Sequence, residues 1–387
     1  MEKIVRTMMQ LIACEVCGRE TDNTLPVLGE AELTRLYRLS KAHDLAHLAG
    51  DVLIRNDLIP DGEIKEKFEK QLMMAVLRYE RSNYELLRLK PLFNEAGIPF
   101  LPLKGSVLRQ YYPEPWMRTS CDIDILIHEE DLDRAITLLE GAPGYRAESR
   151  QSHDVGLYAP SGVHLELHYT LLEDHVVGDA DKVLETVWAR CEPEAELPCC
   201  YRMPDALFYY YHIVHMVKHF QIGGCGVRPF LDIWVMKHRS GMRTDGCDAL
   251  LRDAGLDIFA AEAERLSRVW FEGGEHSELS RQMERYLLGG GVYGSVENRV
   301  AVQQVKEGGK FRYLLSRIWL PYRELKYQYP SLEGRRWLLL FYEIRRWCRL
   351  MTRDGARRGA QELKLNSATD QESQNDTKRM LSLLHLE

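Results

Sequence analysis

A short acidic strand constrains this chain more than any other feature of its sequence. Residues 121–128, CDIDILIH, alternate two aspartates with three isoleucines. Neighbouring side chains of a strand point to opposite faces, so Asp122 and Asp124 share one face and the isoleucines share the other. Two adjacent carboxylates are costly to bury without a cation, and carboxylate oxygens favour Mg²⁺ or Mn²⁺. The pattern predicts a strand with one apolar face and one metal-binding face.

A Lys-Gly-Ser turn lies upstream of the acidic strand. The apolar run Ile98–Leu103 predicts a strand that leads into Lys104, Gly105 and Ser106, and Val107–Tyr112 predicts a helix. A turn between a strand and a helix N-terminus favours phosphate, because free backbone N–H groups and the helix dipole both attract an anion. The serine hydroxyl adds a donor and the lysine adds positive charge. We therefore expect a phosphate-binding turn here.

A third acidic residue follows in a predicted hairpin. Val155–Tyr158 and Val163–Tyr169 flank a Pro-Ser-Gly turn, which is typical of two antiparallel strands. His164, Glu166 and His168 share one face of the second strand. This alternation is also typical of a solvated face. If the hairpin lies beside the aspartate strand, Glu166 becomes the third carboxylate of one site.

Three converging carboxylates suit phosphoryl or nucleotidyl transfer with one or two Mg²⁺ ions. Asp122 and Asp124 would be the shared metal ligands. Glu166 would hold the second ion, take the proton of the acceptor, or do both. Lys104 or Arg118 would neutralise charge on the leaving pyrophosphate.

These motifs carry a resemblance to a known group of enzymes. The Gly-Ser turn, the Asp-x-Asp strand and Glu166 between two leucines resemble the nucleotidyltransferase fold of the polymerase-beta type. More closely, a bacterial family of poorly characterised nucleotidyltransferases is similar to this chain over roughly residues 30–350. The similar segments are LPLKGSVL, MRTSCDIDILI, HLELHY, HIVHMVKH and RPFLDI.

The resemblance implies an α+β fold, with a small mixed β-sheet, flanking helices and helical regions on both sides in the sequence. It implies Asp122, Asp124 and Glu166 as metal carboxylates, and Gly105 and Ser106 as the phosphate-side turn. Sixteen residues separate Gly105 from Asp122, more than in most of the wider superfamily. Two roles for Ser106 therefore remain open. It contacts phosphate, or it merely caps a helix.

Composition shifts and helical periodicity suggest four regions. They are an N-terminal helical region (1–97), a nucleotidyltransferase core (98–175), a helical acceptor-side domain (176–354) and a polar, mobile tail (355–387). Within them we expect one helix over Ala31–Ala49, a helix over Asp61–Glu95 that breaks or kinks at Pro91, and a mobile linker at Asn366–Lys378.

Four residues of the acceptor-side domain are weaker site candidates. His215 and His219 lie one helical turn apart, and they either line the cleft or pack behind it. Arg228 and Asp232 also have this spacing, which predicts an ion pair between them.

Composition limits the remaining possibilities. Lys+Arg is 51 and Asp+Glu is 58, a net charge of −7, so no broad basic field indicates general nucleic-acid binding. The sequence contains no apolar run of about eighteen residues, so we expect no membrane-spanning helix. The N-terminus does not resemble a signal peptide. The nine cysteines are scattered, which favours reduced thiols in a cytoplasmic protein.

We predict transfer of a nucleoside monophosphate from an NTP, with ATP as the expected donor and Mg²⁺ or Mn²⁺ as cofactor. The acceptor would be a hydroxyl of a small molecule or of another acceptor such as a protein side chain, and pyrophosphate would be released. Two alternatives remain open. One is a zinc or metal-dependent hydrolase using His164, Glu166 and His168. The other is a non-catalytic partner-binding protein that retains the fold.

Overall fold

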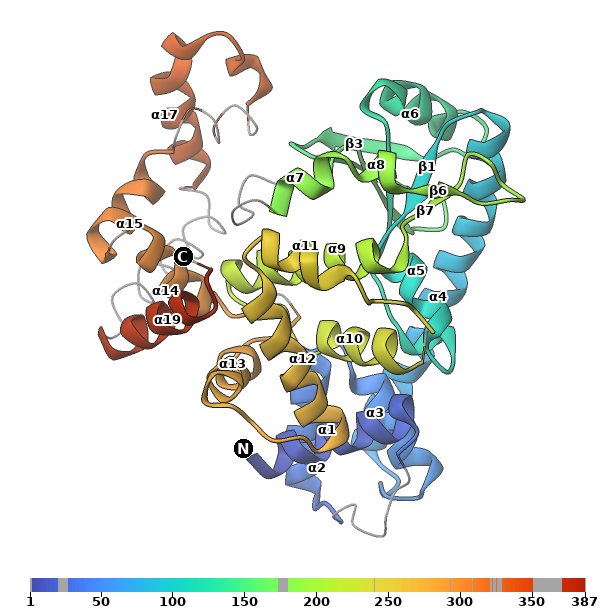
Figure 1. The fold of residues 1–387 in the computed structure, drawn as a ribbon, viewed down its shortest axis with the longest axis vertical. Helices are drawn as coiled ribbons and strands as arrows, with labels where there is room; N and C mark the ends of the chain where they lie inside the picture. The colour runs from blue at the N-terminus through green and yellow to red at the C-terminus, as the bar shows by residue number, and fades with distance from the viewer. Residues whose placement is uncertain are drawn as a thin grey trace.

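The chain combines many helices with a small mixed sheet, which confirms the predicted α+β class (Figure 1). The computed structural model describes residues 2–19, 27–172, 180–239, 241–292, 294–307, 309–320, 322, 325, 329–350 and 371–386. No helix in these ranges has the length and apolarity that crossing a bilayer requires.

Helices dominate both ends of the chain. The N-terminal helices are α1 (Glu2–Cys17), α2 (Glu30–Ala42), α3 (Ala46–Arg55) and α4 (Glu63–Glu95). Near the sheet lie α5 (Gly105–Leu108), α6 (Leu132–Glu140), α7 (Ala180–Glu185) and α8 (Val187–Arg190). The later helices are α9 (Asp205–Ile222), α10 (Arg228–His238), α11 (Cys247–Asp253), α12 (Asp257–Glu272), α13 (Glu278–Leu288), α14 (Val296–Glu307), α15 (Lys310–Ile318), α17 (Leu339–Leu350) and α19 (Gln371–Leu383). Short 3₁₀ turns occur at Arg109–Tyr111, Pro115–Met117, Glu129–Asp131, Pro330–Leu332 and Arg336–Leu338.

The main sheet has the strand order β1-β2-β5-β4-β3. Its strands are β1 (Phe100–Pro102), β2 (Asp122–Ile127), β3 (Arg146–Arg150), β4 (Asp154–Tyr158) and β5 (His164–His168). Strands β2 and β5 are parallel and the other neighbours are antiparallel, so the predicted β4–β5 hairpin is confirmed. A separate ribbon pairs β6 (Glu192–Pro193) with β7 (Tyr201–Arg202).

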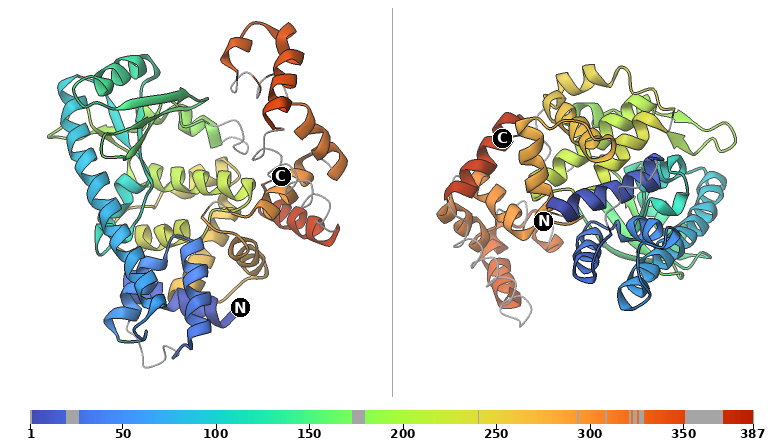
Figure 2. Two further views of the ribbon diagram at one scale, coloured as in Figure 1. Left: turned by 180° about the vertical axis from the view of Figure 1, so that it is seen from behind. Right: turned by 90° about the horizontal axis from the view of Figure 1, so that it is seen from below.

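The two faces of the main sheet differ in chemistry. On one face, Ile125 and Leu165 are fully buried among apolar side chains of α4 and α6, including Phe93 and Leu139. The opposite face carries the acidic and imidazole side chains of β2 and β5. Figure 1 shows α6 on the far side of the sheet from α9, and Figure 2 shows α4 running beside the sheet towards the N-terminal helices. Alternation along the strands thus directs the polar residues away from the sheet core.

Two predicted helices differ from those observed. Helix α4 continues through Pro91, so the predicted break is wrong, although a proline inside a helix costs roughly 3 kcal/mol; the alternative of a kink at Pro91 stays a prediction. Buried Leu89 and Phe93 on either side anchor this part of α4 to the sheet, and such packing outweighs propensity. Conversely, the single helix expected over Ala31–Ala49 is divided into α2 and α3, with Asp44 at a φ of 55° between them.

The C-terminal helix also differs from expectation. Residues 371–378, expected to belong to a mobile linker, are part of α19, while 351–370 lie outside the described residues. Met380 and Leu384 are buried in the largest apolar cluster of the molecule. Gln221 of α9 donates through Nε2 to the carbonyl oxygen of Leu386 at 3.1 Å. Helix α19 therefore packs against α14 and α13, and the segment after it contacts α9, the helix that faces the sheet.

The apolar clusters cut across the expected regions. One cluster joins α1, α2 and α3 with α9, α10 and α12, and a second lies between the main sheet, α4 and α6. N-terminal and acceptor-side helices thus share a core, although the domain limits drawn from the sequence stay a prediction.

A leucine substitution tests the sheet core. Leu139→Ala should lower the free energy of unfolding by about 2–5 kcal/mol, because it removes a fully buried side chain between α6 and the sheet. Denaturant titration followed by circular dichroism measures the change. Leu87→Ala on α4 is the matched control: that leucine is 63% exposed, so its loss should change stability by less than about 0.5 kcal/mol. Equal effects of both variants would contradict this packing.

Candidate active site

The parallel pairing of β2 with β5 brings the three acidic residues onto one face. Asp124 is the register partner of Glu166, and Asp122 is the partner of His164. Ligand atoms of Asp124, Glu166 and His168 all lie within 4.8 Å of one another. Asp122, two residues before Asp124, has the same orientation on the strand. Separate pieces of backbone thus place the carboxylates side by side, and the hairpin lies beside the aspartate strand as the three-carboxylate hypothesis required.

Asp124 has two partners for its negative charge. Its Oδ1 accepts from Lys104 Nζ at 2.8 Å and from His168 Nε2 at 3.0 Å. Burial by itself would raise the pKa of Asp124, but Lys104 and His168 outweigh burial and lower it. Burial and Lys104 would lower the pKa of His168, but its contacts with Asp124 and Glu166 outweigh them and raise it. Asp124 is therefore a buried, ionised carboxylate.

Lys104 reaches Asp124 from an unusual backbone conformation. Its φ is 45°, a region that residues other than glycine rarely adopt. Strain of this kind persists where surrounding structure holds it, often at functional sites. The next residue, Gly105, packs closely: a Cβ there would lie 3.2 Å from Ser120 Cβ. The predicted turn is thus fixed against the segment that precedes β2.

The turn offers fewer free backbone donors than its sequence suggests. The amide of Ser106 donates to the carbonyl of Leu103 at 3.1 Å, and α5 is only four residues long. Ser106 lines a cavity together with Gln110 and Arg202, whereas Lys104 lines a different one. A contact of Ser106 with phosphate stays a prediction, and the lysine is the positive group that faces the carboxylates.

Asp122 carries the excess negative charge of the cluster. Its Oδ1 accepts from Ser120 Oγ at 2.8 Å. Burial, Asp124 and Glu166 raise the pKa of Asp122, and Ser120 and Lys104 only partly oppose them. A cluster whose carboxylates resist ionising together suits a cation, and its oxygen donors suit Mg²⁺ or Mn²⁺.

The structure does not place Arg118 at the carboxylates. Its Nε and NH2 donate to the two carboxylate oxygens of Asp232 at 2.7 and 2.9 Å, and NH1 donates to the Thr119 carbonyl at 2.7 Å. The hydroxyl of Tyr112 donates to the same carboxylate. Only 9% of the Arg118 side chain is exposed. In this geometry Arg118 is paired with Asp232 and does not reach the place where the sequence analysis expected it to neutralise phosphate.

The predicted ion pair between Arg228 and Asp232 is replaced by two longer-range pairs. Asp232 binds Arg118, while Arg228 donates to Asp44 Oδ2 at 3.0 Å and to the Thr119 carbonyl at 3.1 Å. An exposed helix would favour the local pair, but both side chains are directed into the protein. Arg228 and Asp232 therefore hold the segment before β2 and do not line the cavity at Lys104.

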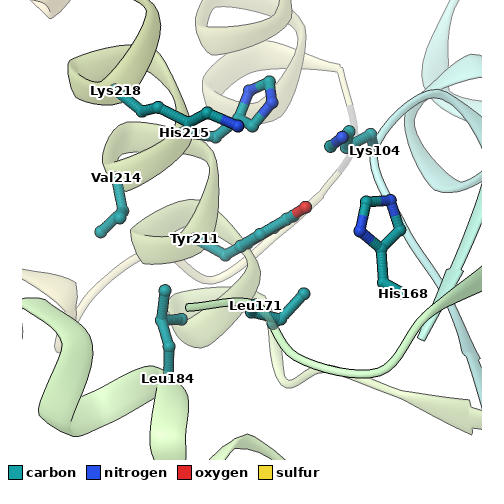
Figure 3. A pocket seen from close by; sticks show the side chains of 8 residues that line it. All are labelled: Lys104, His168, Leu171, Leu184, Tyr211, Val214, His215 and Lys218. Carbon is teal, nitrogen blue, oxygen red and sulfur yellow. The ribbon is translucent and has the colours of Figure 1, made fainter. Parts of the chain in front are cut away.

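Helix α9 closes the space above the carboxylate cluster. A small cavity lies between the sheet and this helix (Figure 3). From the sheet side come Lys104 and His168, and from α9 come Tyr211, His215 and Lys218. The tyrosine hydroxyl points towards the space between the lysine and the imidazole of the sheet side. The two sides thus meet across a shared polar cavity.

Sequence reasoning found only part of the α9 wall. His215 lines the cavity. His219 does not line it but contacts His215, with 3.1 Å between their Nε2 atoms. Tyr211 and Lys218 were missed as site residues. Their signal was present, because positions 211, 215 and 218 follow the i, i+4, i+7 spacing of one helix face. A sequence does not state which element that face opposes.

The predicted zinc set does not form as a group. His164 Nδ1 lies 3.7 Å from Glu166 Oε1, but His164 Nε2 lies 3.8 Å from Glu148 at the other side of the ring. Among the described residues, the potential metal-binding group that contains Glu166 and His168 includes Asp124 and not His164. The alternative based on His164, Glu166 and His168 therefore lacks the geometry it requires.

The cavity also perturbs a lysine. Burial and the neighbouring Lys104 lower the pKa of Lys218 to about 8, and Glu166 only partly opposes them. We expect half-maximal labelling of Lys218 by acetic anhydride near pH 8, because the neutral amine reacts above its pKa. Mass spectrometry of peptides labelled across a pH series measures this. Lys65, whose pKa is raised by Asp61, is the internal control and should label only at higher pH. Identical profiles would contradict the cavity electrostatics.

Removing Asp232 tests the buried ion pair. Asp232→Ala should lower the free energy of unfolding by about 3–5 kcal/mol, because it leaves Arg118 buried without its counter-charge. Thermal and denaturant unfolding measure the loss. Asp61→Ala removes an ion pair with Lys65 whose carboxylate is 94% exposed, and it should leave the free energy of unfolding nearly unchanged. A small loss in Asp232→Ala would show that the pair is not needed.

Comparison with known proteins agrees with this geometry. A family model described as an uncharacterised nucleotidyltransferase matches residues 29–272, more than half of the chain. The matched range includes the acidic cluster, the Lys-Gly-Ser turn and all of α9. Comparison with curated proteins gave no match, and neither did comparison with solved structures. As its motifs predicted, the chain belongs to the family of uncharacterised nucleotidyltransferases.

Proposed function

We propose that this protein transfers a nucleoside monophosphate from an NTP, with ATP as the expected donor, to a hydroxyl acceptor and releases pyrophosphate. The observation that carries the proposal is the placement of three carboxylates on adjoining strands, opposite a helix that presents a lysine. The family assignment supports nucleotidyl transfer in general. The choice of ATP and of a hydroxyl acceptor is our own inference.

Asp122, Asp124 and Glu166 would hold the divalent cation, Mg²⁺ or Mn²⁺. Their fit rests on the donor set and on the raised pKa of Asp122, which marks an unbalanced negative charge. When bound, such an ion supplies Lewis-acid stabilisation of phosphate oxygens and lowers the pKa of a coordinated hydroxyl.

Two lysines would bind the triphosphate from opposite sides of the cavity. Lys104 projects from the sheet side and Lys218 from α9. Lys104 is paired with Asp124 and can exchange that partner for a phosphate oxygen of higher charge. Gly105 and Ser106 would support the phosphates from the turn. The turn lies between the two cavities, because Lys104 lines one and Ser106 lines the other.

Glu166 is our candidate for the group that accepts the proton of the acceptor hydroxyl. About a quarter of its side chain is exposed, whereas the side chain of Asp124 is almost fully buried. A general base has to reach its substrate, and Glu166 is the more accessible of the two. His168 lies 3.5 Å from Glu166 Oε2 and would orient this carboxylate.

The lining of the cavity favours a small-molecule acceptor. Its wall combines apolar Leu171, Leu184 and Val214 with the polar groups of α9. A pocket that combines apolar walls with a few convergent polar groups is typical of a small-ligand site. Transfer to a protein side chain is the other outcome that a screen would detect.

Mutation of the acidic pair tests the proposal. With α-labelled ATP, Mg²⁺ and a panel of hydroxyl compounds, we expect wild-type protein to release pyrophosphate and label one acceptor class. Asp122→Asn and Asp124→Asn should each lower the rate by about 100-fold or more, because a preorganised charge at the reacting phosphate is lost.

A matched control keeps this test specific. Asp133→Asn changes an exposed aspartate on α6, away from the cavity, and should keep the wild-type rate. Circular dichroism establishes that each variant is folded. Wild-type turnover in folded Asp124→Asn would overturn the mechanism.

A further inference from the structure

A second group of metal-binding side chains adjoins the acidic cluster. Asp154 at the start of β4 is the register partner of His168 at the end of β5, and His153 directly precedes Asp154. Ligand atoms of these three residues lie within 4.8 Å of one another. The rings of His153 and His168 stack at a centroid distance of 5.8 Å. The end of the hairpin therefore gathers two imidazoles and one carboxylate.

One oxygen of this group is buried without a partner. The side chain of Asp154 is 7% exposed, and its Oδ2 lies 3.5 Å from His153 Nε2. Its Oδ1 is buried and accepts no hydrogen bond from any described residue. A buried polar atom left unsatisfied costs roughly 1–3 kcal/mol, and native structures retain few of them. A cation at this position would satisfy the oxygen.

We propose that His153, Asp154 and His168 form a binding site for a transition-metal ion of the Zn²⁺ or Co²⁺ class. Imidazole nitrogen suits these ions, whereas Mg²⁺ prefers the oxygen donors of Asp122, Asp124 and Glu166. Three protein ligands leave further coordination positions for water or substrate. The two ligand sets share His168 at their border, so occupancy of one site influences the other.

This site differs in two ways from the zinc set suggested by the sequence. His153 and Asp154 replace His164 and Glu166, and the ligands come from two neighbouring strands instead of one. The inference does not depend on the proposed transfer reaction, because metal binding can be measured without nucleotide or acceptor. Failure of one proposal therefore leaves the other standing.

Cobalt titration tests the site. Metal-free full-length protein is titrated with Co²⁺ at neutral pH and followed by visible absorption, which reports nitrogen and oxygen coordination of this ion. We expect one Co²⁺ bound per chain with visible absorption, displaced by Zn²⁺ but not by a large excess of Mg²⁺. His153→Ala should weaken Co²⁺ binding by about 100-fold, because it removes one of three protein ligands.

Three further variants make the outcome decisive. Asp154→Asn keeps the side-chain shape and should also weaken binding, which answers the question if His153→Ala does not fold. Asp122→Asn changes only the oxygen-rich site and should retain Co²⁺. His238→Ala removes a histidine that is 42% exposed on α10 and controls for surface binding. Displacement of Co²⁺ by Mg²⁺, absence of Co²⁺ binding in wild type, or equal binding in folded His153→Ala would each overturn the proposal.

Discussion

Repulsion between neighbouring carboxylates is the constraint around which this structure is arranged. Strand alternation turns Asp122 and Asp124 to one face, and parallel pairing adds Glu166 beside them. Such charges are tolerable in a low-dielectric environment only with counter-charges close by. These come from Lys104 in the turn after β1 and from His168 on β5. The acidic strand therefore requires both neighbouring strands in register, and it links the fold of the sheet to the properties of the site.

A second buried network supports the first without touching it. Arg118 and Asp232 form a two-point ion pair, and Arg228 joins Asp44 to the carbonyl of Thr119. All these contacts converge on the segment directly before Asp122. Buried ion pairs contribute little net stability compared with apolar packing, but they tolerate few alternative arrangements. Their effect here is to fix where β2 begins, and through Ser120 to fix the rotamer of Asp122.

Local patterns predicted much of the site, and non-local contacts limited the rest. Period-two alternation predicted which residues share each face of β2 and of β5. The Pro-Ser-Gly turn predicted that β4 forms a hairpin with β5. Local sequence could not identify the partner of Asp232. Arg228, four residues before Asp232, has the spacing of a helical ion pair, whereas the actual partner, Arg118, is 114 residues away. Strand β3 escaped notice because RAESR has no apolar alternation. The role of Lys218 depended on which element α9 opposes, and only tertiary structure decides that.

Helix α9 connects the cavity to a distant part of the chain. Lys218 lines the cavity, and Gln221, almost one turn later, holds the backbone of Leu386 next to α19. One helix therefore carries both the polar wall of the cavity and the contact to the segment that follows α19. The position of that wall and the position of this segment are linked through the backbone of α9.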